Sequence, residues 1–345
     1  MQLNRIIQGD ALEVLKTLPE GSVNCCITSP PYFGLRDYSR DGQIGLETTP
    51  EDYVRKLMDV FREVKRVLKD DGTLWLNLGD SYVGGGFGVS KDENYDLGKQ
   101  CTNRGTADFE TRKKLGKLKA KIDGLKSKDL IGIPWRVAFA LQADGWYLRQ
   151  DIIWAKPNPM PESVTDRCTK SHEYIFLLSK KPKYYFDNEA IKEKSVGDDP
   201  RMIDGFVPKS VNGKHANDKQ NSSNRKKYKP TEAGGGTSMV NHNGYFKADG
   251  SPIGTAGKRN KRDVWTITVS SFAEAHFATF PKALIEPMVL AGCPKGGAIL
   301  DPFMGAGTTA VVAKRNNRKY LGIELNGDYI KIAAERLKGI TSSMF

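Results

Sequence analysis

The sequence has few cysteines, few histidines and no long apolar run. Its cysteines form no CxxC pair, and there are five of them: Cys25, Cys26, Cys101, Cys168 and Cys293. An odd number without metal-ligand spacing argues against a disulfide framework and a zinc site, so we expect reduced, mostly structural thiols and no metal. No stretch approaches the roughly 20 apolar residues of a membrane helix, and residues 1–10 lack the apolar middle of a signal peptide. We therefore expect a cytoplasmic protein with no membrane partner.

Acidic residues are also in the minority, because 41 Asp and Glu face 53 Lys and Arg, for a net charge of +12. The excess lies in two segments. Residues 99–128 hold ten basic residues against three acidic ones, and residues 195–262 hold thirteen against six. Concentrated positive charge favours a polyanionic ligand, because each neutralised phosphate releases counterions. Two solvated surface loops are the alternative interpretation.

Short apolar runs alternate with helical patterns, which is typical of an α/β fold with a mostly parallel sheet. The expected strands are Arg5–Gln8, Val23–Thr28, Thr73–Leu78, Tyr147–Ala155, Glu173–Ser179, Ala298–Asp301 and Lys319–Glu324. The expected helices are Ala11–Leu18, Pro50–Leu68, Pro134–Ala143, Pro281–Ala291, Thr308–Asn316 and Asp328–Leu337. Residues 84–128 and 196–262 break this pattern and are too long for ordinary connections.

The run Thr28-Ser29-Pro30-Pro31-Tyr32 directly follows the second expected strand. Two prolines at a strand end donate no hydrogen bonds and fix the backbone, so carbonyl groups there point outward. Such acceptors suit the exocyclic amino group of a base, a poor nucleophile because its lone pair is delocalised into the ring. Held by the Ser29 side chain and the Pro30 carbonyl, the nitrogen would become pyramidal, while Tyr32 stacks on a base removed from the duplex. A strand ended by prolines, with a packed tyrosine, is the alternative.

Residues 299–309 read Ile-Leu-Asp-Pro-Phe-Met-Gly-Ala-Gly-Thr-Thr, a strand that runs into a glycine turn and then a helix. Glycines let backbone approach a ligand closely, and free N–H groups at a helix start suit a carboxylate. The next strand ends at Glu324, which is placed to accept hydrogen bonds from ribose hydroxyls. Together these features predict a nucleoside cofactor, although Glu324 alone could be a surface acid.

With these motifs the sequence resembles the amino-directed DNA methyltransferases, in the permuted arrangement where the catalytic motif precedes the cofactor motif. The resemblance also uses Gly9-Asp10-Ala11 and Phe280-Pro281, and it covers most of the chain outside the two basic segments. It implies a Rossmann-like, mostly parallel, seven-stranded and circularly permuted sheet that carries an inserted target-recognition region. The implied reaction is direct in-line transfer of a methyl group from S-adenosylmethionine, without a covalent enzyme intermediate.

The resemblance implies a role for each matching residue. Those that bind and activate the target amino group are Ser29, Pro30, Pro31 and Tyr32. Those that bind S-adenosylmethionine are Asp10, Phe280, Asp301, Phe303, Gly305, Gly307, Thr308 and Glu324. Within the second set, Asp10 contacts the adenine amino group, Glu324 holds the ribose and the glycine turn holds the methionine part.

The expected strand order places these residues together. If Ala298–Asp301 and Lys319–Glu324 are the first two strands, then Arg5–Gln8 and Val23–Thr28 are the third and fourth. Polar residues at the four strand ends then line one edge, where open α/β sheets bind ligands; these are Asp10, Ser29, Asp301 and Glu324.

Residues near the last strand pair are less clearly functional. Trp154, Lys156 and Asn158 border the target-base pocket in one interpretation, but an aromatic residue in an apolar strand is more often part of the core. For His172, packing or capping is expected rather than catalysis.

We expect a catalytic part at residues 1–195 with a basic loop at 84–128, a target-recognition insertion at 196–262, and a cofactor-binding part at 263–345. The expected partner is double-stranded DNA, with residues 99–128 gripping phosphates, in a nucleoid-associated monomer or homodimer of a bacterial or phage-infected cell. A cognate restriction endonuclease, a phage origin and solitary action all stay open.

In the resembled family, serine before the two prolines usually accompanies cytosine N4 and aspartate usually accompanies adenine N6, so Ser29 favours cytosine. Methylation at carbon 5 would need a cysteine after a proline, and Cys293-Pro294 has the opposite order. Adenine N6 is the alternative. RNA or protein methyltransferases, and a catalytically silent DNA-binding protein on this fold, are the rivals.

Overall fold

The computed structural model describes residues 1–35, 40, 42–84, 122–194, 258–269 and 280–340. Most of both basic segments, residues 99–121 and 195–257, lies outside the described residues. The chain divides into two compact units. The larger unit joins Met1–Ile191 to Arg262–Phe345, and the smaller unit is Lys192–Lys261. In the described part of the smaller unit, β6 (Glu193–Lys194) pairs antiparallel with β7 (Lys258–Arg259).

One eight-stranded sheet forms the centre of the larger unit, in the order β1-β10-β9-β2-β3-β5-β4-β8. Its strands are β1 (Arg5–Gln8), β2 (Val23–Thr28), β3 (Leu68–Leu78), β4 (Tyr147–Ala155), β5 (His172–Ser179), β8 (Val264–Thr266), β9 (Ala298–Asp301) and β10 (Lys319–Glu324). Only β5 runs antiparallel to its neighbours, β3 and β4. The mostly parallel α/β sheet that the sequence predicts is therefore present.

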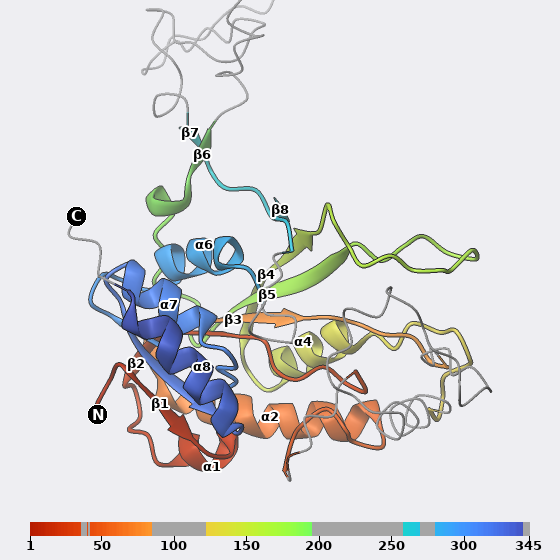
Figure 1. The fold of residues 1–345 in the computed structure, drawn as a ribbon, viewed down its shortest axis with the longest axis horizontal. Helices are drawn as coiled ribbons and strands as arrows, with labels where there is room; N and C mark the ends of the chain where they lie inside the picture. Colours follow the sequence, from red (N-terminus) through yellow and green to blue (C-terminus); the bar gives the residue numbers. More distant parts are fainter. Residues whose placement is uncertain (36–39, 41, 85–121, 195–257, 270–279, 341–345) are drawn as a thin grey trace, which may run out of the picture. The chain divides into compact units, whose positions relative to one another are not determined.

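Helices cover both faces of this sheet (Figure 1). On one face lie α1 (Ala11–Lys16), α2 (Pro50–Val67) and α4 (Ile133–Ala143). On the other lie α6 (Lys282–Gly292), α7 (Thr308–Arg315) and α8 (Gly327–Lys338). A short 3₁₀ helix, η2 (Glu189–Ile191), contacts α6. None of the helices in the described ranges is both long and apolar enough to cross a membrane.

Strand residues divide alternately between two apolar cores, because successive side chains on a strand point to opposite faces. Cys26 joins the core beneath α1, α2 and α4, whereas its neighbours Cys25 and Ile27 join the core beneath α6, α7 and α8. Burial raises the pKa of the Cys25 and Cys26 thiols well above the ordinary value. Both are free and buried, which confirms the structural role predicted for them.

The start of α2 illustrates why these elements form where they do. Thr49 is extended, and its hydroxyl accepts a hydrogen bond from the Asp52 amide at 3.0 Å, which satisfies a donor that the first helical turn leaves free. Pro50 then occupies the first turn, where its missing N–H costs nothing. These two local features place the helix start at the residue that the sequence predicts.

The predicted elements agree closely with the structure, with two corrections. The sheet has eight strands rather than the expected seven, because β8 has three residues and is too short to give a pattern. In addition, β3 begins at Leu68 rather than Thr73, since the chain passes directly from α2 into an exposed stretch of strand.

The packing at Gly292 gives a test of the core. A Cβ there would lie 2.4 Å from Trp75 Nε1 and 2.9 Å from Cys25 Sγ, and Trp75 is fully buried. We expect Gly292→Ala to lower the unfolding free energy by about 1–3 kcal/mol, because an overpacked core must shift. Urea unfolding followed by circular dichroism measures the change.

Gly339→Ala is the matched control, because a Cβ at Gly339 meets nothing within 4 Å and its φ is −83°. Equal stability of the two variants would contradict the close packing of α6 on β3.

Candidate active site

The carboxyl ends of four neighbouring parallel strands bring the predicted polar residues to one edge of the sheet. Asp301 and Glu324 end β9 and β10, Asp10 lies two residues beyond β1, and Ser29 directly follows β2. The pairs β1–β10, β10–β9 and β9–β2 are all parallel, so these ends coincide. The structure thus places together the four residues that the strand order predicts.

The segment after β2 is braced from two sides. The Tyr53 hydroxyl of α2 donates to the Pro31 carbonyl at 2.8 Å, and the Gly34 amide donates to the Gly45 carbonyl at 2.8 Å. Gly45 has a φ of +105°, and a Cβ there would lie 3.0 Å from the Tyr32 carbonyl oxygen, so the position requires glycine. Within the described residues, no group donates to the Pro30 carbonyl, which leaves that oxygen available as an acceptor.

A polar network surrounds the end of the Tyr32 side chain. Its hydroxyl donates to Glu173 Oε2 at 2.7 Å and accepts from Asn77 Nδ2 at 2.8 Å. Ser29 Oγ lies 3.3 Å from the same hydroxyl, and Lys156 forms an ion pair with Glu173 Oε1. Burial and the nearby Glu173 carboxylate raise the pKa of Tyr32 well above its ordinary value, so the hydroxyl keeps its proton.

Asn77 also belongs to the network around Tyr32. Its Oδ1 is buried and has no hydrogen-bond partner among the described residues, while its Nδ2 donates to both Tyr32 and Glu173. Buried polar atoms are normally satisfied, so this unpaired oxygen carries an uncompensated desolvation cost next to the Tyr32 network.

Asp301 holds the glycine turn from beneath. It is fully buried, and its Oδ1 accepts from the Thr28 hydroxyl at 2.7 Å and the Phe303 amide at 3.1 Å, while Oδ2 accepts from the Thr309 hydroxyl at 2.7 Å. Burial raises the pKa of Asp301 to about 6 despite these three donors. The carboxylate has no exposed surface, so what these contacts do is hold the turn in shape.

Glu324 binds the same turn from the next strand. Its Oε2 accepts from the Gly305 amide at 2.7 Å and its Oε1 from the Asn326 amide at 2.8 Å. A carboxylate has about four acceptor positions, so room for ligand hydroxyls remains. Burial raises the pKa of Glu324 above its ordinary value. Beside it, Asp10 caps α1 through the Glu13 amide at 3.1 Å, and the Gly9 amide donates to the Glu324 carbonyl at 3.1 Å.

The two glycines of the turn face different surroundings. Gly305 has a φ of +51°, and a Cβ there would meet nothing within 4 Å, so the turn is open on that side. Gly307 has a φ of +78°, and a Cβ there would lie 2.7 Å from the Ala333 Cβ, so glycine lets α8 pack against the turn. No side chain caps α7, which leaves its first amides for a ligand.

The remaining cofactor candidates are only partly available. The Thr308 hydroxyl accepts from both terminal nitrogens of Arg336 at 3.2 Å, so its backbone is the more available group. Phe280 and Phe303 are half-buried and pack against the two cores on opposite faces of the sheet.

Sequence reasoning missed Asn77 and left Glu173 without a role. Of the residues predicted to border a base pocket, Lys156 joins the Tyr32 network through Glu173, but Trp154 is buried and its indole donates to the Ile267 carbonyl at 2.8 Å. Asn158 pairs with the Val269 backbone. His172 packs edge-on against Tyr174, and burial lowers its pKa, which agrees with the packing role expected for it.

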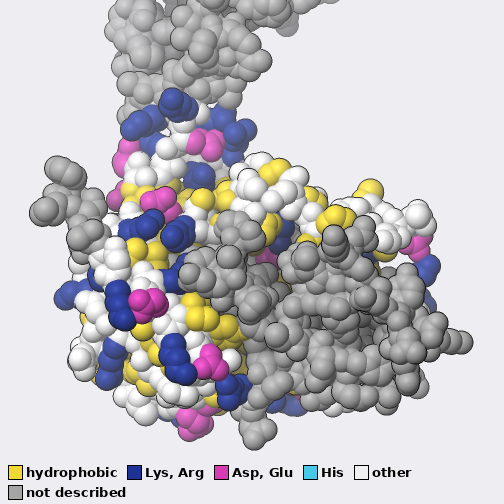
Figure 2. Space-filling model, in the orientation of Figure 1, with side chains coloured by type: hydrophobic (Ala, Val, Ile, Leu, Met, Phe, Trp, Pro, Cys, Tyr) yellow, Lys and Arg dark blue, Asp and Glu magenta, His cyan; other side chains and the backbone are white. Residues whose placement is uncertain are grey.

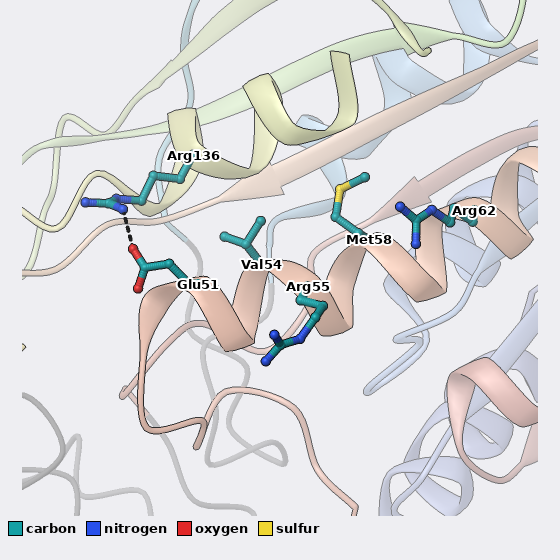
Figure 3. Close-up of a pocket in the computed structure, with 6 residues that line it drawn as sticks. All are labelled: Glu51, Val54, Arg55, Met58, Arg62 and Arg136. Carbon is teal, nitrogen blue, oxygen red and sulfur yellow. Dashed lines mark hydrogen bonds and ion pairs between the residues drawn. The ribbon is translucent and has the colours of Figure 1, made fainter. Parts of the chain in front are cut away.

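Two other features bear on the choice of site. A shallow hollow of about 340 Å³ lies between α2 and α4, where Arg136 reaches Glu51 at 2.7 Å (Figure 3). None of the predicted site residues lines it. Among the residues that the structure describes, no group of three or more His, Cys, Asp or Glu could hold a metal ion.

Comparison with known proteins gives concordant matches. The DNA methylase family model of N6 and N4 methyltransferases matches residues 23–335. The type II methyltransferase M.SmaI of Serratia marcescens is 43% identical over 333 residues, spanning 96% of this chain and 90% of that protein. The type II methyltransferase M.Cfr9I of Citrobacter freundii is 42% identical over 334 residues, spanning 97% and 87%.

Two solved structures share the fold. The PvuII DNA methyltransferase (cytosine-N4-specific) aligns with a TM-score of 0.57 at 17% identity, covering 100% of this chain and 92% of that one. A Thermus thermophilus protein assigned as a DNA modification methylase, solved with S-adenosyl-L-methionine, aligns with a TM-score of 0.52 at 22% identity, covering 98% of each chain.

The buried Asp301 carboxyl predicts a pH-dependent stability. Its pKa is about 6 in the folded chain against an ordinary 3.8, so between these pH values the folded chain keeps a proton that the unfolded chain releases. We expect its contribution to the unfolding free energy to fall by about 3 kcal/mol as pH rises from roughly 3 to 7. Urea unfolding at several pH values, without cofactor, measures this.

Asp301→Asn is the matched variant, because the amide cannot titrate. The raised pKa of Glu324 acts in the same direction and is present in both proteins. A difference in stability between wild type and Asp301→Asn that does not change over this pH range would contradict the prediction.

Proposed function

The chain belongs to the DNA methylase family of N6 and N4 methyltransferases, and we propose that this S-adenosylmethionine-dependent type II DNA methyltransferase methylates N4 of cytosine in duplex DNA. Adenine N6 is the alternative target. The proposed enzyme acts at a specific sequence, removes the base from the duplex and transfers the methyl group in one in-line step.

One hydrogen bond carries this proposal. The Thr28 hydroxyl, next to the acceptor Ser29, donates to Asp301, which supports the glycine turn. The acceptor segment and the turn are therefore fixed to each other at the carboxyl ends of β2 and β9, which are neighbours in the sheet. An enzyme that transfers a group between a base and a nucleoside cofactor needs this fixed relation, because orientation supplies much of the rate acceleration.

The residues of this edge fit S-adenosylmethionine. The uncapped start of α7 offers amides for the methionine carboxylate, and Gly305 leaves open space over the turn. Glu324 would hold the ribose hydroxyls, and Asp10, whose Oδ2 has no donor among the described residues, would accept from the adenine amino group. When bound, the cofactor supplies a methyl group on a positively charged sulfur.

The acceptor segment prepares the amino nitrogen for attack. Ser29 Oγ and the Pro30 carbonyl would each accept one amino hydrogen, which draws the lone pair out of conjugation with the ring. Tyr32 would offer its ring face to the extruded base. These acceptors also stabilise the positive charge that develops on the nitrogen.

The choice of cytosine depends on Ser29. Its hydroxyl is neutral and short, and serine at this position usually accompanies cytosine N4 in the family, whereas aspartate usually accompanies adenine N6. The rivals are weaker: RNA and protein methyltransferases with a related Pro-Pro-Tyr motif usually place the cofactor motif first. This chain has the opposite order, as a circularly permuted sheet would.

Basic side chains suit the proposed duplex DNA partner. The smaller unit carries Lys192, Lys194, Lys258, Arg259 and Lys261 around the β6–β7 pair, where Figure 2 shows blue side chains gathered. In this proposal residues 196–262 select the target sequence and residues 99–128 bind phosphates.

The acceptor roles predict a split between turnover and cofactor affinity. We expect Ser29→Ala and Tyr32→Ala to lower the single-turnover rate of methyl transfer by about 10²-fold or more, because the lost contacts act on the transition state. The dissociation constant for S-adenosylmethionine should change less than about threefold. Rapid-quench kinetics and isothermal titration calorimetry give the two values.

Ser22→Ala and Tyr147→Ala serve as controls, since the first hydroxyl bonds only to the Pro19 carbonyl and the second side chain is exposed. Equal losses of rate and cofactor affinity in the Ser29 and Tyr32 variants would argue against the assigned roles.

The methylated product tests the function itself. Purified protein is incubated with duplex DNA of diverse sequence and labelled S-adenosylmethionine, and the digested nucleosides are identified by mass spectrometry. We expect N4-methylcytosine, because Ser29 precedes the two prolines. N6-methyladenine would keep the mechanism but replace the base, and label in RNA or protein instead of DNA would overturn the proposal.

A further inference from the structure

We propose that Ser29, Tyr32 and Glu173 form a proton relay that carries the surplus proton of the methylated amino group to the Glu173 carboxylate. This inference rests on the proposed function and adds a step to it. The three side chains connect in series: Ser29 Oγ lies 3.3 Å from the Tyr32 hydroxyl, which lies 2.7 Å from Glu173 Oε2. They come from the segment after β2 and from β5, which are 141 positions apart in sequence at Tyr32 and Glu173.

The chemistry requires such a step. When the methyl group moves, the carbon–sulfur bond breaks with its electron pair left on sulfur, and a new nitrogen–carbon bond forms. The amino nitrogen then holds two hydrogens, a methyl group and a positive charge, so one nitrogen–hydrogen bond must break. A hydroxyl that already accepts that hydrogen is the nearest base, but serine alone is too weak a base to keep the proton.

The relay balances without any further reactant. The proton leaves nitrogen for Ser29 Oγ, the former Ser29 proton passes to the Tyr32 oxygen, and the former Tyr32 proton passes to Glu173 Oε2. Serine and tyrosine end the step neutral, and the carboxylate ends it protonated. Glu173 returns its proton to water after the methylated base leaves.

Asn77 sets the direction of the relay. Its amide nitrogen can only donate, and it lies 2.8 Å from the Tyr32 oxygen and 2.9 Å from Glu173 Oε2. The two amide hydrogens are used by these short contacts, so Ser29 Oγ, at 3.4 Å, keeps its lone pairs for the substrate. Because Asn77 and Ser29 both donate to the Tyr32 oxygen, the Tyr32 hydroxyl directs its own hydrogen at the carboxylate.

The surroundings of Glu173 suit a terminal acceptor. The carboxylate side chain is 14% exposed, so proton exchange with bulk water is restricted during the reaction. Lys156 pairs with Oε1, the oxygen that Tyr32 does not use, and its ammonium lies 4.3 Å from the centre of the Trp154 ring. This pairing places a positive charge beside Oε1 and leaves Oε2 directed at Tyr32.

The relay is tested with two conservative variants that cannot move the proton: one keeps the hydrogen bond from Tyr32 to residue 173, and the other keeps the aromatic ring at residue 32. Glu173→Gln still accepts from Tyr32 through its amide oxygen, and Tyr32→Phe keeps the ring that would stack on the base. We expect each to lower the single-turnover rate of methyl transfer by about 10²-fold, the usual contribution of general base catalysis. Affinities for S-adenosylmethionine and DNA should stay within about threefold of wild type.

Chemical rescue separates a proton acceptor from a residue that only holds its neighbours in place. In Glu173→Ala, added formate or acetate should restore part of the rate, and the more basic anion should restore more. Glu63→Gln is the control, because Glu63 forms a comparable ion pair with Arg66 at 2.8 Å on α2 and does not contact the site.

The outcomes are distinct. Loss of rate in Glu173→Gln and Tyr32→Phe, with rescue of Glu173→Ala, supports the relay. Wild-type rates in either conservative variant overturn the relay. It is also overturned if all three variants lose rate and neither formate nor acetate restores the rate of Glu173→Ala. Wild-type protein that yields no methylated nucleoside would instead refute the proposed function, so the two failures cannot be confused.

Discussion

A single buried carboxylate joins the two halves of the site. Asp301 accepts from Thr28 on one side and from Phe303 and Thr309 on the other, so the end of β2 and the turn after β9 are held by the same group. Burial removes water from around the Asp301 carboxylate and so disfavours its charged form. A neutral side chain at this position would not lower the unfolding free energy in this way. The fold tolerates that cost where the carboxylate fixes the end of β2 against the glycine turn after β9.

The rest of the edge depends on the parallel pairing of four strands. At the end of each strand the chain leaves the sheet and becomes accessible to solvent, which suits a polar residue. Because the neighbouring strands are parallel, these ends lie on one side of the sheet. The antiparallel strand β5 adds Glu173, which lies near the amino end of its strand rather than the carboxyl end. This strand begins at the site and runs away from it, so Glu173 lies at the same edge of the sheet.

The sequence predicts most of the fold because the signals are local. Alternation and apolar runs mark the strands, and the cap at Thr49 marks α2 within its own turn. The segment of residues 28–32 and the glycine turn are short continuous runs of sequence, so each of their residues can be identified from the sequence alone. By contrast, the contact of Tyr32 with Glu173 depends on the register between β3 and β5, which no short window of sequence contains. Asn77 looks like an ordinary polar strand residue until its neighbours on β2 and β5 are known.

The order of the strands has a consequence for how the protein is made. β1 pairs with β10, and the Asn4 amide bonds to the Tyr320 carbonyl at 2.7 Å, so β1 pairs with a strand that is made about 316 positions later. The centre of the sheet closes only when β9 is inserted beside β2. A growing chain therefore contains residues 29–32 long before it contains the glycine turn after β9. In the proposed enzyme, methyl transfer can therefore begin only after β9 and β10 have been made and have formed these long-range pairings.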